Sequence, residues 1–194
     1  AIYGGAIVFE DTSPAGRKTV AEYWDPESLA LSLHNILMGV PIINARFFKK
    51  SVYEKIGFYD LRYQIGADRD FLLRVALAQI KSYTIGRIVY QYRRHPRSLT
   101  LFPERRKDIL KEHIRMSEDY MLDETLPSEV RRQAKIWHTR ESAEGAILSL
   151  RQRRCRDALS YAGRGFKYDR LWGLAFGSLI LTKTARRIFR RGVS

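Results

Sequence analysis

The sequence is organised around IGADRDFLLR, residues 65–74, where Asp68 and Asp70 stand two positions apart at the head of an apolar run. The run predicts a helix from Asp68 to about Ala78, because its apolar residues recur at the spacing of one helix face. Segments rich in β-branched and aromatic residues precede and follow this helix. The first part of the chain is therefore expected to be a mixed α/β structure.

The two acids of this stretch are expected to play different parts. A turn of about 100° per residue places Asp68 on the apolar side of the helix with Phe71, and Asp70 on nearly the opposite side. Asp70 stands four positions before Arg74, a spacing typical of a surface ion pair worth a few tenths of a kcal/mol, roughly. Asp68 fits two roles, since it can cap the helix by accepting a backbone N–H or act as a general base. Residue types alone leave both roles open.

The rest of the α/β part, residues 1–102, is read from turn, strand and helix patterns. Its predicted elements are a strand at 2–9, one or two strands around Gly86 within 82–94, helices at 26–39 and 50–57, and an extended segment at 41–48.

Residues 103–194 carry only helical patterns and are expected to form a basic helical extension. The four predicted helices are 104–122, 128–150, 155–167 and 171–190. The last part, residues 151–194, holds 12 Lys and Arg against 2 Asp and Glu, a balance of +10. Such an excess points to an anionic partner surface. Cys155, the single cysteine, is predicted to be buried, because it lies on an apolar stripe at helical spacing with Ala158, Leu159, Ala162 and Phe166.

Four segments of the first part together resemble the second half of a bacterial family 2 glycosyltransferase. They are YGGAIVFED, PIINARFFKKSVYEKIGFYD, IGADRDFLLRVALA and VYQYRRHPRSLT, in this order. The resemblance implies the GT-A fold, a nucleotide-binding α/β sheet with the donor site at its strand ends. The expected fold is thus the second half of a GT-A domain followed by the helical extension.

The resemblance assigns the catalytic role to Asp68. The family has an Asp at the head of a helix that ends in Leu-Arg, and Ala67-Asp68 followed by Leu73-Arg74 matches it. Asp68 would then deprotonate the acceptor hydroxyl in an inverting, single-displacement transfer of a sugar. Capping of the helix need not be excluded, because one carboxylate can do both.

Other residues gain a possible role from the same resemblance. His95 stands in a Tyr-Arg-x-His-x-x-Ser context that in similar enzymes helps to hold a divalent metal, Mg²⁺ or Mn²⁺, or the donor diphosphate. Residues expected to bind donor or acceptor are Asn44, Arg46, Arg93, Arg94, Arg97 and Ser98. For the residues at 93–98, His95 included, a solvated basic loop without a binding role remains the alternative.

One departure from the family pattern is large. The metal-binding Asp-x-Asp and the strands that hold the nucleotide base precede the Tyr3-Gly4 strand in the family, and this sequence does not contain them. We therefore expect a piece of a longer enzyme that carries the acceptor side and is inactive alone. The implied partners are the missing N-terminal half, a nucleotide-sugar donor and a glycan or lipid-linked acceptor of cell-surface polysaccharide synthesis.

The C-terminal segment 171–191 combines an apolar run with a cluster of cations, and the run is too short to span a bilayer. We expect it to attach a cytoplasmic enzyme peripherally to an anionic membrane, or else to pack on the domain. The residues expected to contact the membrane are Trp172, Phe176, Lys183, Arg186, Arg187, Arg190 and Arg191. The alternative to an enzyme is a basic helical module that binds a membrane, a partner protein or nucleic acid. No nucleic-acid-binding motif is visible, so nucleic acid is not expected.

Overall fold

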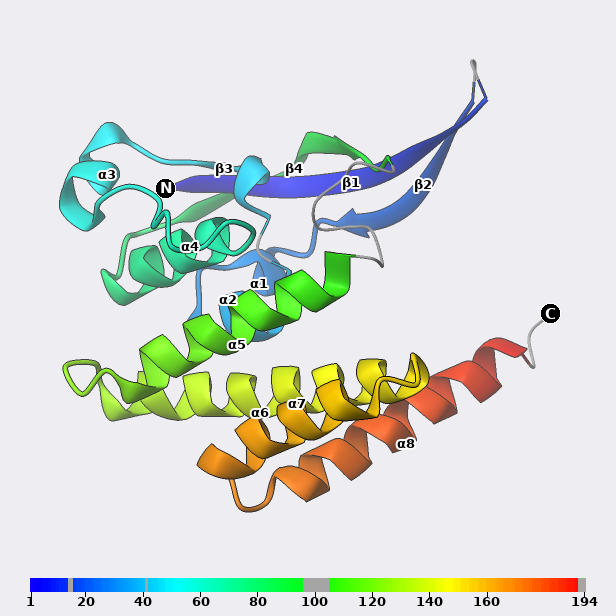
Figure 1. Cartoon of the computed structure of the whole chain (residues 1–194). Coiled ribbons are helices and arrows are strands. Elements are labelled where there is room, and N and C mark those ends of the chain that lie inside the picture. The colour runs from blue at the N-terminus through cyan, green and yellow to red at the C-terminus, as the bar shows by residue number, and fades with distance from the viewer. Residues whose placement is uncertain (14–15, 41, 96–104, 192–194) are drawn as a thin grey trace. The chain divides into compact units, whose positions relative to one another are not determined.

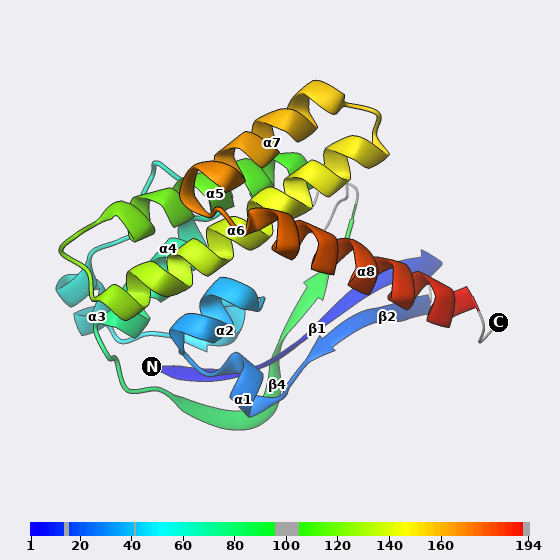
Figure 2. The same ribbon diagram turned by 90° about the horizontal axis from the view of Figure 1, so that it is seen from below.

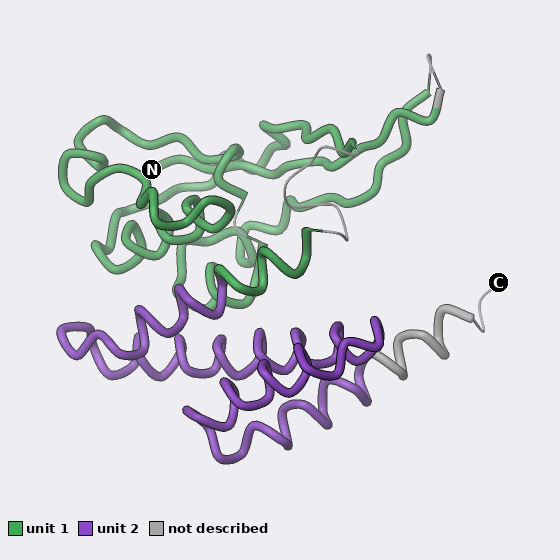
Figure 3. Tube along the Cα trace, in the orientation of Figure 1, with its two compact units in different colours: residues 1–112 green, residues 113–194 purple. Residues whose placement is uncertain are grey.

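The computed structural model describes residues 1–13, 16–40, 42–95 and 105–191 (Figure 1). The chain forms two compact units, residues 1–112 and 113–194 (Figure 3). The division falls inside helix α5 (Arg106–Leu122), so the first turns of that helix belong to the α/β unit. The mixed α/β class expected from the sequence is confirmed, with a small mixed sheet in the first unit.

Unit 1 is built on a four-stranded sheet in which β1 pairs with every other strand. The strands are β1 (Ile2–Ser13), β2 (Gly16–Tyr23), β3 (Arg46–Phe47) and β4 (Tyr83–Arg93). β2 and β3 run antiparallel to β1, whereas β4 runs parallel to it, with Ile2 opposite Tyr83 and Phe9 opposite Arg93. The parallel pairing brings the carboxyl ends of β1 and β4 to the same end of the sheet. β2, the second strand of a hairpin, was not predicted from the sequence.

The Tyr3-Gly4 strand needs its glycine because β4 approaches it closely. A Cβ at Gly4 would lie 2.6 Å from the Arg87 carbonyl oxygen and 2.8 Å from both methyl groups of Val89. Such distances are far below van der Waals contact, so any side chain here would push β1 and β4 apart.

The helices of unit 1 are short, and Figure 1 shows α1, α2 and α4 on the same side of the sheet. They are α1 (Pro26–Leu29), α2 (Leu33–Met38), the single 3₁₀ turn η1 (Ile43–Ala45), α3 (Lys50–Ile56) and α4 (Ala67–Leu77). The single helix expected over 26–39 is two helices. Ser32 starts the second by accepting the Asn35 N–H at 3.1 Å, and the Asn35 amide donates to the Glu27 carbonyl at 2.6 Å. These bonds satisfy the broken helix ends.

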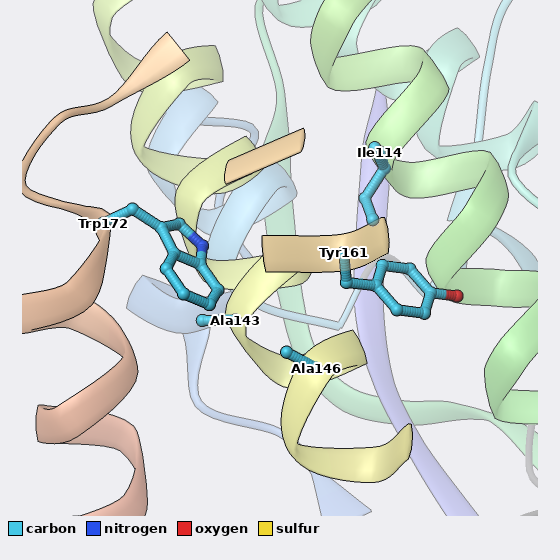
Figure 4. Close-up of a cluster of buried hydrophobic side chains, with 5 residues drawn as sticks. All are labelled: Ile114, Ala143, Ala146, Tyr161 and Trp172. Carbon is cyan, nitrogen blue, oxygen red and sulfur yellow. The ribbon is translucent and has the colours of Figure 1, made fainter. Parts of the chain in front are cut away.

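Unit 2 is helical, as expected, and α6 (Ser128–Arg151) packs against both α7 (Cys155–Tyr168) and α8 (Trp172–Arg191). Figure 2 shows these three helices from a second direction. Their shared core, drawn in Figure 4, contains Ile114, Ala143, Ala146, Tyr161 and Trp172. A Cβ at Gly145 would lie 2.6 Å from the Tyr161 ring, and one at Gly165 would lie 2.2 Å from the Trp172 ring. The two glycines therefore allow the two aromatic rings to lie directly on helix backbones.

The apolar stripe predicted on α7 is confirmed for Ala158 and Ala162, which pack against the core, and is wrong for its other three members. Cys155, Leu159 and Phe166 are exposed, whereas Ala158 and Tyr161 face the core. Since α7 has apolar residues on two sides, periodicity could not decide which side α6 would cover. Among the described residues, no helix has the length and apolar character that crossing a bilayer requires.

Candidate functional site

Asp68 lies in the first turn of α4, behind Gly66, which is the N-cap residue. Asp68 is not the N-cap residue, but its Oδ1 accepts the N–H of Arg69 at 2.7 Å, which is one of the free N–H groups of the first helical turn. Its side chain is half-buried. Burial raises the pKa of the Asp68 carboxyl above its ordinary value, against the Arg69 N–H and guanidinium, which both lower it. A carboxyl of raised pKa with one oxygen left for a proton has the properties of a general base.

The loop that leads to Asp68 is held by a carboxylate from α5. Glu112 accepts the backbone N–H groups of Gln64 at 3.1 Å, Ile65 at 2.8 Å and Gly66 at 2.9 Å. Charge-assisted bonds of this kind are roughly twice as strong as neutral ones. Glu112 therefore fixes the position from which α4 begins. Sequence reasoning missed it, because nothing local marks an acid on one helix as the partner of a loop 46 residues earlier.

Tyr59 is the aromatic neighbour of Asp68. Burial first, then Tyr53 and the negative charge of Asp68, raise the pKa of the Tyr59 hydroxyl. The Tyr59 and Phe71 ring centroids are 5.0 Å apart, and Phe71 also stacks on Tyr53 at 5.0 Å. Tyr59 is still exposed on its other side. An exposed aromatic ring beside a carboxylate is a suitable surface for a sugar, which has apolar faces and hydroxyl edges.

The prediction of a surface ion pair for Asp70 is wrong. Asp70 is only 4% exposed, and the Arg74 Nε donates to its Oδ2 at 2.9 Å. The two Nη atoms of Arg74 donate to the carbonyl oxygens of Ile56 and Phe58, at 2.5 and 2.7 Å. The pair is buried because α3 and its following loop cover the side of α4 that was expected to face solvent. It ties α4 to the end of α3.

A buried arginine beside Asp68 was also missed. Arg69 donates to the carbonyl oxygens of Ile36, Leu37 and Gly39 at the end of α2. These carbonyls lack partners within their own helix, so the guanidinium completes the C-terminus of α2. Arg69 and Asp70, the two residues that follow Asp68, thus both take part in contacts that anchor α4 to neighbouring helices.

Asn44 and Arg46 were expected to face donor or acceptor. Asn44 lies in η1, and Arg46 lies in β3, which pairs with the start of β1. Arg46 is buried, donates through Nη2 to the Leu29 carbonyl at 2.7 Å, and lies over the Tyr3 ring at 5.2 Å. Burial lowers the pKa of Arg46 to about 10. Its contacts are those of a residue that joins β3 to α1. Asn44 is exposed, and its amide donates to the Tyr90 hydroxyl at 3.3 Å.

Arg93, Arg94 and His95 lie together at the carboxyl ends of β1 and β4. Arg94 pairs with Glu10, and an Nη atom of Arg93 is 3.6 Å from Asp11. Arg93 and Arg94, two of the three arginines expected to bind donor or acceptor in this loop, are therefore engaged by acids of β1, Arg93 weakly and in solvent. His95 is exposed.

The predicted residues do not form one cluster in the described part of the chain. Asp68 shares no hydrogen bond with Arg93, Arg94 or His95 there, and Arg97 and Ser98 lie outside the described residues. Within the same described ranges, no group of three or more His, Cys, Asp or Glu side chains is arranged to hold a metal ion. The residues described here therefore do not fit the implied metal site, and no step is derived through a metal.

Trp172 does not contact a membrane, contrary to the sequence-based expectation. It is 4% exposed, and its Nε1 donates to the Ser142 hydroxyl at 2.9 Å. Phe176 stacks on it at 5.2 Å and packs partly against the same core. The backbone of α8 continues to Arg191, but the side chains of Lys183, Arg186, Arg187, Arg190 and Arg191 lie outside the described residues.

Unit 2 also holds two buried His–Glu pairs that sequence reasoning missed. The His113 Nδ1 is 3.0 Å from Glu141, and the His138 Nε2 is 3.3 Å from Glu118. Glu118 accepts two further hydrogen bonds from Arg164, at 3.2 and 2.8 Å. Each acid comes from a different helix than its histidine or arginine, so the pairs are consequences of the helix packing.

Comparison with known proteins adds no assignment. No protein-family model, no curated protein and no solved structure matches this chain.

Proposed function

We propose that unit 1 is the acceptor side of a GT-A glycosyltransferase, in which Asp68 is the general base of an inverting sugar transfer. The resemblance of the four segments supplies the reaction class. The single structural observation that supports it is the state of Asp68, a half-buried carboxyl with raised pKa in the first turn of α4.

The proposed step moves one proton and one glycosyl group. The acceptor O–H gives its proton to Asp68 while its oxygen forms a bond to the anomeric carbon of the donor sugar. The bond from that carbon to the diphosphate oxygen breaks, and the nucleoside diphosphate leaves with the electron pair. A single displacement inverts the anomeric centre. General-base assistance of this kind contributes about 10²–10⁴-fold to the rate.

The other residues of unit 1 have supporting roles in this proposal. Tyr59 offers the acceptor sugar an aromatic surface beside the base. Glu112 holds the loop 64–66, and Asp70 with Arg74 holds the next turn of α4, so that the base is positioned before the acceptor binds. A nucleotide sugar would be the donor, as the resemblance implies.

The test is the Asp68→Asn change in the intact gene product. The amide keeps the shape and the bond to the Arg69 N–H but cannot accept a proton. We expect release of nucleoside diphosphate from a panel of nucleotide sugars to fall by about 10²–10⁴-fold. Asp60→Asn is the matched control, because Asp60 lies in the preceding loop and pairs with exposed Arg62, at 2.8 Å. Wild-type turnover in Asp68→Asn would exclude the proposal.

The stability of the same variant separates lost chemistry from lost folding. The pKa of Asp68 is raised in the folded state, so the ionised carboxylate destabilises the fold at pH 7. This destabilisation is absent below the unfolded pKa of about 4 and develops as the pH rises through the folded-state pKa. Asp68→Asn should thus be at least as stable as the wild type at pH 7, with the advantage shrinking toward acidic pH in urea unfolding. An inactive variant that is also unstable at pH 7 would show a structural role instead.

A further inference from the structure

The outer side of α7 and α8 carries large apolar side chains that the fold leaves in solvent. Five of them define what we call the α7–α8 apolar face: Leu159, Phe166, Leu171, Leu174 and Leu181, between 51% and 74% exposed. The two helices contact each other, and Phe166 meets α8 at Gly173 and Trp172. The opposite sides of the same helices carry Tyr161 and Trp172 into the core. The face is therefore the side of this helix pair that α6 does not cover.

Cations outnumber acids in the part of the chain that carries this face. Residues 151–194 carry 12 Lys and Arg against 2 Asp and Glu. Both acids are already engaged: Asp157 pairs with Arg154 at 2.5 Å, and Asp169 accepts the Thr139 hydroxyl and the Leu171 N–H. Exposed cations, among them Arg156, Lys167 and Arg170, lie on the same two helices or in the turn between them. The apolar face thus lies in a strongly positive field.

We propose that the α7–α8 apolar face binds the surface of an anionic membrane, with the leucines and Phe166 in the interfacial layer and the cations on lipid phosphates. Exposed leucine and phenylalanine gain free energy by leaving water for the acyl-chain boundary, and anionic headgroups neutralise the charge. The proposal needs no sugar transfer and stands apart from the proposed function. The proposed contact surface differs from the one expected from the sequence, because it lies on the side of α8 opposite to Trp172 and Phe176 and also includes α7.

The charge and the residue types argue against the other occupants. A second copy would bring two surfaces of the same positive sign together, which is repulsive. Nucleic acid would be attracted by the cations, but its grooves and phosphates give exposed leucines no apolar contact, and single strands use aromatic stacking instead. An anionic lipid surface offers an apolar layer to the leucines and Phe166 and phosphate groups to the cations.

Vesicle co-sedimentation of the 194-residue chain tests the proposal. Binding should need phosphatidylglycerol in phosphatidylcholine vesicles and should weaken in high salt, because the headgroup attraction is screened. Leu174→Ser with Leu181→Ser should lower the partition constant about tenfold or more, since two large apolar side chains leave the interface. Leu122→Ser is the matched control, as Leu122 is 57% exposed on α5, outside the face, and should leave binding unchanged.

Cys155 gives a direct readout because it is exposed, is the single cysteine, and stands one helical turn before Leu159. An environment-sensitive fluorophore on its Sγ should shift to the blue with anionic vesicles and be quenched by brominated lipid. Equal binding to phosphatidylcholine alone, or unchanged binding of the double leucine variant, would overturn the proposal. A chain that is dimeric without lipid and becomes monomeric in that variant would instead assign the face to a second copy. Tight binding of an oligonucleotide that displaces the vesicles would assign it to nucleic acid.

Discussion

At the scale of single residues, burial decides what each acid of ADRD does. Asp68 is half-buried, and its side chain is engaged by backbone N–H groups of its own helix turn and by no acid or base of another helix among the hydrogen bonds of the described residues. Asp70, two residues later, is enclosed and holds Arg74 in a network that ends on two backbone carbonyls. The first arrangement raises the cost of ionisation, while the second stabilises the contact of α4 with α3.

We expect Asp70→Ala to destabilise unit 1 by about 3 kcal/mol, because Arg74 would remain partly buried without its anion. The measurement is the free energy of unfolding from urea titration. Glu129→Ala is the matched comparison, since Glu129 pairs with Arg132 at 2.7 Å on a fully exposed helix turn and should have no measurable effect. Similar losses in the two variants would show that Asp70 is as solvated as its spacing to Arg74 suggested.

At the scale of elements, the start of α4 and its preceding loop are positioned by two contacts with other helices. Glu112 of α5 collects three N–H groups before the helix, and Arg69 completes the end of α2 beside it. A carboxylate with three backbone donors is a stronger fixation than any single cap. The start of α4 is therefore set by another helix and not by its own N-cap, which is a glycine.

Glu112→Gln should loosen this loop, because the amide NH₂ turns a donor toward backbone donors. We expect amide hydrogen exchange at residues 64–66 to speed up by about tenfold or more, while α7 keeps its protection. If Asp68 is the base, kcat should fall with little change in KM, as for a positioning residue. Glu54→Gln is the control, because Glu54 pairs with Lys50 at 3.5 Å in solvent. Unchanged exchange at 64–66 would contradict this role.

At the scale of the whole molecule, each unit has its own core and its own titratable network. In unit 2 the fully buried His138 faces Glu118 of α5 and Arg164, Lys167 and Tyr168 of α7. Its Nδ1 is buried and has no hydrogen-bond partner among the described residues. Burial lowers the pKa of His138, with Arg164 and Lys167 acting in the same direction and Glu118 opposing them.

The stability of unit 2 should therefore fall on mild acidification. A depressed folded-state pKa gives stability that is complete above the unfolded value of about 6.5 and is lost as the pH falls through the folded value. The fluorescence of Trp137 and Trp172, both buried in unit 2, reports its unfolding. We expect the urea midpoint to decrease from pH 7.5 toward 5, roughly, and His138→Gln to flatten this dependence. An equally steep dependence in His138→Gln would attribute it to other groups.

The sequence by itself determined most of the helices and two of the strands, but neither β2 nor the division between α1 and α2. α4, the four helices after residue 103, and the strands at both ends of the first hundred residues follow from local periodicity and turn residues, which act over a few positions. It also determined the positive charge of the C-terminal part, which depends on composition alone.

Only the tertiary structure decided which sides of those elements are covered. Asp70 and Trp172 are buried because distant parts of the chain pack on them. Leu159 and Cys155 are exposed because α6 packs on the other side of α7. The hydrogen bonds of Glu112 to the loop before Asp68 join residues that are 46 to 48 positions apart in the sequence. Periodicity describes one helix in isolation, whereas burial, pKa shifts and long-range hydrogen bonds depend on its neighbours. The surroundings of Asp68 and the exposed side of α7 and α8 could therefore be found only in three dimensions.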